Sequence, residues 1–192
     1  CRCFAAATPA QVAARRSQVV VYYRSRAGFP VVRFPNGLEM VAGGDTFNPP
    51  MPVRSQLSLS WGCNDIGPFF PTIPDCTTLV RAHVHFPDCW DSVHRDTLDH
   101  RSHMAFSSNG GVCPASHPVN LPRLTIHVQY FLRLGSTAEL SSDMDAPAGS
   151  TLHGDFWNTW GQRALGIIVD RCLNAGTECP HLDDASFRAL TS

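Results

Sequence analysis

The sequence predicts a mainly β protein of the α+β class: an antiparallel, sandwich-like core with long disulfide-pinned loops and one C-terminal helix packed on it. Three observations support this. Several segments alternate apolar and polar residues, proline and glycine separate them, and one stretch repeats its apolar residues at helical spacing. With 192 residues and 43% hydrophobic content, the chain can bury its own core. We therefore expect residues 1–192 to form one domain.

The first third of the chain is expected to hold a helix and several strands. Residues 5–16 are rich in alanine and favour a short helix. Residues 17–24 are dense in β-branched and aromatic side chains, which predicts a buried strand. Turn signals at Pro35-Asn36-Gly37 and Gly43-Gly44 separate the next expected strands, at residues 31–34, 38–42 and 54–61.

Two further segments, residues 79–86 and 124–131, alternate strictly and predict strands of an antiparallel sheet with one solvated side. In the second, Leu124, Ile126, Val128 and Tyr130 are expected to point inward. In the first, Arg81, His83 and His85 share one face. We interpret His83, His85 and His127 as surface residues because these faces are predicted to point to solvent.

Helical spacing near the C-terminus predicts a helix over residues 156–174. Its apolar positions are Phe156, Trp160, Ile167, Ile168 and Cys172, and Asn174-Ala-Gly176 provides the end signal. Asp155 stands where an N-cap or a first-turn acid belongs.

The eight cysteines indicate an oxidising compartment, because no CxxC pair or other zinc spacing occurs. Neighbouring cysteines lie at loop-closing distances, and each closure would contribute about 3 kcal/mol. Eight cysteines allow about 105 pairings, so the neighbour assignment is one hypothesis among many. The expected pairs are Cys63 with Cys76, Cys89 with Cys113, and Cys172 with Cys179. Cys1 and Cys3 have no obvious near partner, which favours an upstream segment absent from this chain.

Charge and hydropathy exclude two classes of partner. The formal net charge is −1 and the pI about 6.8, so no broad basic field exists to hold a nucleic acid. No apolar run reaches the length of a membrane span. No charged-then-apolar leader is present either, so we expect a secreted protein whose leader was removed, or a piece of a longer precursor. The oligomeric state is left open.

A histidine- and aspartate-rich segment is the main candidate for chemistry, since the chain has no phosphate loop, GxSxG, HExxH or EF-hand motif. Residues 86–104 hold four Asp and three His. If Cys89 pairs with Cys113, then His100, His103 and His117 are drawn together. His153-Gly-Asp155, at the expected helix start, would face the same place.

Such a set supports acid–base catalysis or binds one divalent metal ion. The candidate catalytic residues are His100, His103, His117, His153, Asp155 and Asp99, and the candidate metal ligands are His100, His103, His153 and Asp155. The alternative is that Asp91, Asp96 and Asp99 organise the loop and the histidines cap its turns. His94 fits either interpretation, and His181 has no informative context.

Tryptophans offer a second functional idea, a platform that stacks on sugar rings. The candidates are Trp90 and Trp157, because Trp160 is expected to pack in the core with Phe156 four residues earlier. Burial is the alternative for each tryptophan.

Four separated motifs resemble an uncharacterised secreted domain family. They are residues 86–91 (FPDCWD), 99–106 (DHRSHMAF), 113–118 (CPASHP) and 153–160 (HGDFWNTW). Members of that family occur in fungi, often beside WSC carbohydrate-binding modules, and in actinobacteria. The resemblance runs from residue 19 to residue 174 and implies secretion and association with sugars, but no particular reaction. It directs attention to His100, His103, His117 and His153. Family members usually carry an upstream His-x-His-Asp-Phe-type motif that this chain lacks.

Three functions follow as hypotheses. The leading one is an extracellular enzyme, a hydrolase or lyase acting on polysaccharide or cell-wall glycan through the histidine set. The second is a non-catalytic glycan-binding or cell-envelope module. The third is a structural or assembly protein.

Overall fold

The computed structural model describes residues 18–26, 28–44, 59–77, 79–108, 111–131 and 138–177. Within them the chain divides into two compact units. The first contains residues 18–21, 42–85 and 125–154, and the second contains residues 22–41, 86–124 and 155–177. The single-domain expectation stays a prediction, and so does the helix at 5–16, which lies outside the described residues. Among the described residues, no helix has the length and apolar character that a bilayer crossing needs.

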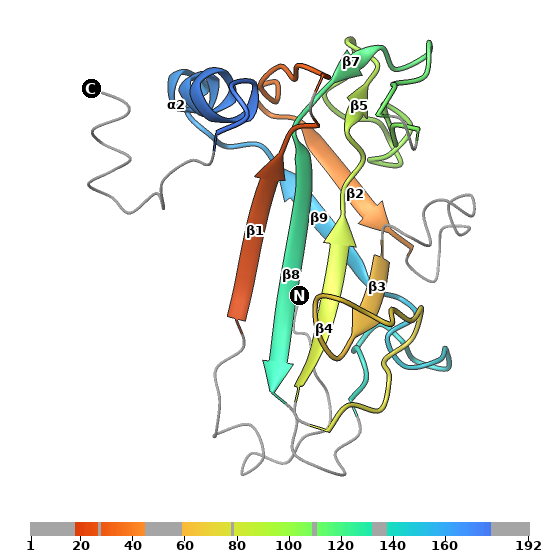
Figure 1. The fold of residues 1–192 in the computed structure, drawn as a ribbon. Coiled ribbons are helices and arrows are strands. Elements are labelled where there is room, and N and C mark those ends of the chain that lie inside the picture. Colours follow the sequence, from red (N-terminus) through yellow and green to blue (C-terminus); the bar gives the residue numbers. More distant parts are fainter. Residues whose placement is uncertain are drawn as a thin grey trace. The chain divides into compact units, whose positions relative to one another are not determined.

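A four-stranded sheet with the order β1-β8-β4-β3 contains the predicted long strands (Figure 1). Its members are β1 (Gln18–Arg24), β8 (Arg123–Phe131), β4 (Leu79–His85) and β3 (Leu59–Gly62). β4 is antiparallel to both β3 and β8. The mainly β class with antiparallel pairing is therefore confirmed. Of the strand predicted at 54–61, residues 54–58 lie outside the described part.

β1 forms as predicted, but it is not buried. Val19, Val20 and Val21 are 60%, 43% and 44% exposed. The reason is its place in the sheet order, where β1 is an edge strand with a single neighbour. A run of β-branched residues favours extended backbone whether or not a second layer covers it, so composition predicted the strand and not its environment.

The core of the first unit forms around Trp61, which is 1% exposed. Its indole N–H donates to the carbonyl of Gly149 at 2.9 Å. The loop carrying Gly149 is organised by buried Asp143, whose carboxylate accepts hydrogen bonds from the backbone N–H groups of Leu140, Gly149 and Thr151. Burial raises the pKa of Asp143, but these bonds outweigh it and the pKa is lowered. The loop is thus fixed by a buried carboxylate.

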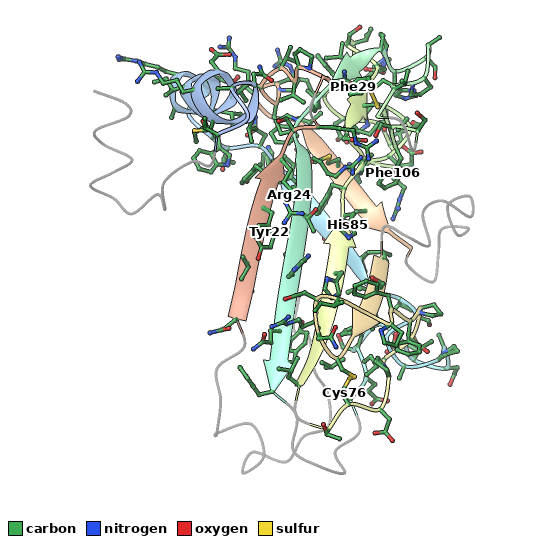
Figure 2. All side chains as sticks on the ribbon, viewed as in Figure 1. Tyr22, Arg24, Phe29, Cys76, His85 and Phe106 are labelled. Atoms are coloured by element: carbon green, nitrogen blue, oxygen red, sulfur yellow. A yellow bond between two sulfur atoms is a disulfide. The ribbon has the colours of Figure 1, made fainter. Side chains whose placement is uncertain are left out.

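Two disulfides close the expected loops. Cys63 pairs with Cys76 in the first unit, and Cys76 lies in the loop that precedes β4 (Figure 2). Cys89 pairs with Cys113 in the second unit. These are two of the pairs that the spacing predicted. Cys172 is also disulfide-bonded, while Cys1, Cys3 and Cys179 lie outside the described residues.

The other strands of the described residues lie in two small sheets. β5 (Cys89–Trp90) lies between β6 (Met104–Ala105) and β7 (Val119–Asn120). β2 (Glu39–Gly43) pairs with β9 (His153–Trp157). β2 matches the strand predicted at 38–42. Residues 31–34 form no strand, because Val31 hydrogen-bonds the side-chain amide of Asn174 through both its N–H and its carbonyl instead of joining a ladder.

The predicted helix begins later than expected. Residues 153–157 are strand β9, α2 spans Gln162–Ile168, and the π-helix η2 (Val169–Leu173) continues it to the predicted end. Asn158 explains the difference: it is 1% exposed, its side-chain amide donates to the carbonyls of Phe34 and Pro35, and its backbone N–H donates to Leu38. These long-range bonds hold the segment extended, so Asp155 is an exposed strand residue and no N-cap.

The aromatic pairing expected on that helix is also wrong. The ring of Phe156 packs against Phe34, with centroids 5.1 Å apart. Trp160 instead meets the ring of Tyr23 edge-on at 6.0 Å and donates its indole N–H to the Tyr23 hydroxyl. An extended backbone places residues 156 and 160 too far apart to stack on one another.

Substituting Gly149 by alanine should destabilise the first unit strongly. Gly149 has φ +80°, and an added Cβ would lie 2.5 Å from Ile73 and 2.6 Å from the indole nitrogen of Trp61. We expect a loss of about 1–2 kcal/mol from the left-handed backbone and a further ~1–3 kcal/mol from overpacking. Gly37→Ala is the control, since Gly37 has φ +72° and nothing within 4 Å. Urea unfolding should show the larger loss in G149A, and equal losses would refute the packing argument.

Candidate functional site

The candidate site is a hairpin loop between β5 and β6, residues 91–103, named here the histidine loop. Trp90 of β5 pairs with Met104 of β6, so the ends of the loop meet. The backbone N–H of Asp91 also donates to the carbonyl of His103 at 3.1 Å. A compact loop whose ends meet is ordered by contacts among its own residues.

Three aspartates supply that order. Asp91 accepts from the backbone N–H groups of Val93 and His94, and Asp96 accepts from that of Thr97. Asp99 accepts from the N–H groups of Arg101 and Ser102 at 3.1 and 3.0 Å, and it also accepts from the hydroxyls of Thr97 and Ser102. These are the Asx-type turns that the alternative interpretation of the loop expected.

The same bonds keep Asp99 ionised. They lower the pKa of Asp99 well below the usual range of a carboxyl group, and the backbone N–H of Ser102 contributes most. The other donors lower it further, while burial has the opposite effect. A carboxylate so stabilised cannot deliver a proton near neutral pH. Asp99 is therefore a loop organiser in this structure rather than an acid.

His103 anchors the histidine loop from inside. Its residue exposure is 0%, its Nε2 donates to the carbonyl of Glu39 at 2.7 Å, and its Nδ1 lies 2.9 Å from the hydroxyl of Thr97. Both ring nitrogens are thus engaged and neither reaches solvent. Although His103 was a candidate catalytic residue and metal ligand, its position is that of a structural tie between β2 and the loop.

His100 is the exposed histidine of the loop. Its Nδ1 donates to Asp96 at 2.6 Å, and its backbone has φ +52°, held by bonds to Thr97 and Val41. The bond to Asp96 is the largest cause that raises the pKa of His100; burial opposes it, and the charges of Asp96, Glu39 and Asp155 support it. Nε2 has no hydrogen-bond partner among the described residues, so it is the ring atom that can meet a ligand.

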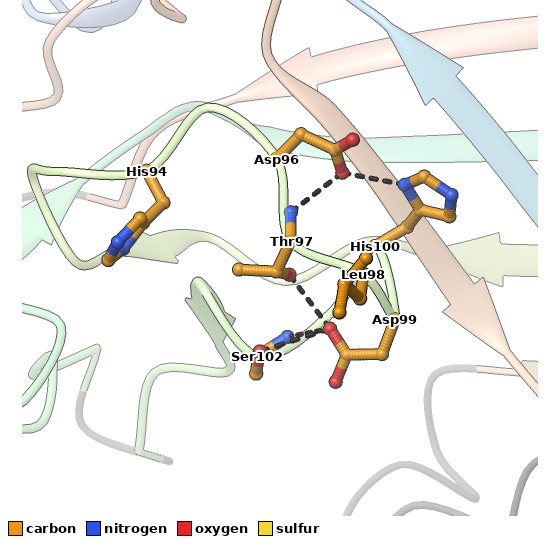
Figure 3. A pocket seen from close by; sticks show the side chains of 7 residues that line it. All are labelled: His94, Asp96, Thr97, Leu98, Asp99, His100 and Ser102. Atoms are coloured by element: carbon orange, nitrogen blue, oxygen red, sulfur yellow. Dashed lines mark hydrogen bonds and ion pairs between the residues drawn. The ribbon is translucent and has the colours of Figure 1, made fainter.

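The histidine loop lines an open surface hollow of about 850 Å³, which presents the Asp96–His100 pair (Figure 3). The two partners lie side by side, and Leu98 is fully exposed. The lining residues are His94, Asp96, Thr97, Leu98, Asp99, His100 and Ser102. Ligand atoms of Glu39, Asp96 and His100 lie within 4.8 Å of one another, a spacing that could hold a cation.

The disulfide-linked segment brings one more predicted histidine to the loop. His117 Nε2 donates to the carbonyl of Ser102 at 3.0 Å, and Nδ1 lies 2.9 Å from the hydroxyl of Ser116. Because both nitrogens are engaged, His117 braces the histidine loop in this structure.

His153 and Asp155 are separated by the boundary between the two units. His153 belongs to the first unit, where its Nδ1 donates to the carbonyl of Thr151 at 3.0 Å. Asp155 belongs to the second unit and is exposed. The expectation that both sit at a helix start is wrong, because β9 holds them.

The two candidate tryptophans differ in accessibility. Trp90 is partly buried and donates its indole N–H to the carbonyl of His94, so it supports the histidine loop. Trp157, on β9, is 65% exposed and leaves a ring face for a ligand.

The prediction that His83 faces solvent is wrong: His83 is 3% exposed. Loop 63–76, closed by its disulfide, covers this face of β4, and Phe69 meets the His83 ring edge-on at 5.0 Å. Strand alternation assigned the residue to the correct face, but it could not show that a loop covers that face. Two groups of side chains that could hold a metal ion include residues that the sequence did not indicate as site candidates: Glu39, Asp65, His83 and His127. Pairing the two alternating strands in register would have brought the two histidines together.

Fold and site define a mainly antiparallel β protein with disulfide-closed loops and a histidine loop ordered by its aspartates. The chain belongs to the family described as a domain of unknown function, DUF1996, whose model matches residues 5–160. The resemblance to an uncharacterised domain family is thereby confirmed. No curated protein and no solved structure matches the chain.

Replacing His103 by alanine should lower the free energy of unfolding by about 2–4 kcal/mol, because it leaves a cavity and unpaired partners. His94→Ala is the matched control in the same loop, since that side chain is 60% exposed. Denaturant unfolding followed by tryptophan fluorescence measures both. An H103A protein as stable as H94A would contradict the anchoring role.

Asp96→Asn should lower the pKa of His100 toward its ordinary value, since it removes the charged acceptor that stabilises the imidazolium. Asp91→Asn is the control: Asp91 makes an equivalent 2.6 Å bond to His94 and does not touch His100. Histidine Cε1–H NMR titration of each variant gives the measurement. A His100 titration unchanged in D96N would show that Asp96 does not set it.

Proposed function

We propose that this chain is an extracellular domain that acts on polysaccharide or cell-wall glycan, with His100 as the proton-transferring group. The observation that carries the proposal is the Asp96–His100 pair, 2.6 Å apart and exposed beside the hollow. Of the four histidines that the motifs singled out, His100 combines solvent access, a charged partner and an uncommitted ring nitrogen among the described residues.

The raised pKa favours His100 as an acid rather than a base. Asp96 fixes the ring through Nδ1, and the protonated ring can then donate from Nε2 to the oxygen of a leaving sugar. Glu39 and Asp155 add negative charge that stabilises the imidazolium before the transfer. Asp91 and Asp99 hold the loop in shape while this occurs.

The disulfides support an extracellular location, because such bonds persist in oxidising compartments. The glycan part of the proposal is supported by the sugar-binding modules that accompany the family it resembles. An open hollow lined by hydroxyl, carboxylate and imidazole groups suits the hydroxyls of a sugar chain.

A second candidate, a non-catalytic glycan-binding module, is favoured by Trp157. A tryptophan 65% exposed on a strand offers the flat apolar face on which sugar rings stack. This candidate needs no proton transfer, so products distinguish the two.

The test is incubation of the protein with a panel of cell-wall glycans, with assays for new reducing ends, unsaturated products and binding. His100→Gln should reduce turnover about 100-fold or more and leave binding intact. His94→Gln, which alters the other Asp-paired histidine of the loop, should retain activity. Wild-type turnover should fall as the pH rises through the pKa of His100, because the acid form is then lost. In D96N this fall in turnover should occur at lower pH, because the substitution lowers the pKa of His100.

Each outcome assigns the function. Binding without products, abolished in Trp157→Ala, replaces the enzyme by the binding module. Turnover that survives in H100Q overturns the role of His100. A panel that is neither bound nor altered overturns both candidates.

A further inference from the structure

Two histidines face each other across the central strands of the first unit. The antiparallel register pairs His83 of β4 directly with His127 of β8. Their ring centroids are 4.3 Å apart and the planes cross at 70°, so the rings meet edge to face. Neither belongs to the histidine loop, and they require a separate explanation.

A carboxylate joins this pair. Asp65 stands on the loop closed by the Cys63–Cys76 disulfide, and its Oδ1 lies 3.5 Å from His127 Nδ1. Its Oδ2 is bound by Arg81, which also donates to the side-chain oxygen of Gln129. Arg81 therefore fixes the orientation of Asp65 and leaves Oδ1 directed at the histidines.

A second observation, at His83, points to a ligand at this pair. The residue is 97% buried, and its Nε2 has no hydrogen-bond partner in the described part of the chain. A buried polar atom without a partner destabilises a fold, so native proteins seldom keep one without a function.

The hydrogen bond at the other nitrogen of the His83 ring explains why Nε2 has a free lone pair. The backbone of Asn64 hydrogen-bonds the His83 ring in the sense that raises the pKa, so its carbonyl accepts the bond. Since Nε2 has no partner, Nδ1 must donate it. This fixes the tautomer with its lone pair on Nε2, the arrangement found in metal-ligating histidines.

We propose that Asp65 Oδ1, His83 Nε2 and His127 Nδ1 bind a divalent transition metal ion of the zinc class. The ligand atoms offered by the three residues lie within 4.8 Å of one another. A tetrahedral zinc ion with bonds of about 2.0–2.1 Å spaces its ligand atoms ~3.3 Å apart. The 3.5 Å between Asp65 and His127 matches that spacing and is longer than an ordinary hydrogen bond.

The donor chemistry selects the ion. Two imidazoles and one carboxylate suit zinc, whereas calcium and magnesium prefer an all-oxygen shell. Three protein ligands leave a fourth position for water or a substrate atom. Phe69, against the His83 ring, provides an apolar cover that strengthens the electrostatic interactions beneath it.

The Glu39–Asp96–His100 group of the histidine loop is the natural comparison. There the Nδ1 of His100 already donates to Asp96, both partners are exposed, and two of the three groups are carboxylates. That group contains no buried unpartnered atom, so it serves as the control.

The experiment begins with elemental analysis of protein purified without chelators, followed by chelation and titration with Zn²⁺ by calorimetry and with Co²⁺ by visible absorption. We expect one ion per chain in the wild type. Asp65→Asn and His127→Gln keep the side-chain size and should weaken Zn²⁺ binding by more than the ~10–100-fold typical of outer-shell changes. Glu39→Gln and His100→Gln should bind as the wild type does.

Two further measurements show whether a variant that fails to bind Zn²⁺ is nevertheless folded. Circular dichroism and thermal unfolding of each apo variant establish that it is folded, and Zn²⁺ should raise the melting temperature of the wild type but not of D65N or H127Q. Shifts of the His83 and His127 Cε1–H resonances on adding Zn²⁺ would place the ion directly. Absence of tight Zn²⁺ binding, or binding lost in the histidine-loop variants instead, overturns the proposal. Because its readout is metal binding, this result is independent of glycan turnover.

Discussion

The antiparallel register of β4 on β8 is the constraint on which the first unit depends. Seven residue pairs, from Leu79↔Phe131 to His85↔Thr125, fix it. Val80, Ala82 and Val84 are buried on one face, which forces Arg81 and His83 to the other. A slip of one residue would exchange the faces, placing the charged and imidazole groups in the core. The core and the histidine pair are therefore two results of the same register.

The order of the histidine loop, in the second unit, arises from polar groups rather than from apolar packing. The histidine loop contains exposed apolar side chains such as Val93 and Leu98, so burial does not hold it. Instead, each aspartate accepts bonds from the backbone of the following residues, and buried His103 ties the loop to β2. Loops ordered in this way can present a side chain such as His100 in a left-handed backbone conformation, which a loop held only at its ends would not maintain.

Local patterns predicted those features that local chemistry decides. Alternation located β4 and β8, cysteine spacing located Cys63–Cys76 and Cys89–Cys113, and Asp-rich composition indicated turn-forming aspartates. Features decided by distant parts of the chain were missed. The amide of Asn158 bonds carbonyls more than 120 residues away and delays the helix. The cover over His83 comes from a loop whose path no pattern in β4 reveals. The residues from Phe156 onward do have helical spacing, but these tertiary contacts override that local preference and hold the segment extended.

Environment, rather than histidine count, separates the two candidate sites chemically. His83 is buried and its Nε2 has no hydrogen-bond partner among the described residues, so a cation can use that lone pair. Asp96 raises the pKa of His100, so that ring carries the proton which an acid needs and which a metal would have to displace. Histidine therefore suits metal binding at one site and proton donation at the other. Because both effects require neighbours from elsewhere in the fold, the motif residues indicated where chemistry could occur, and packing determines which chemistry each position can support.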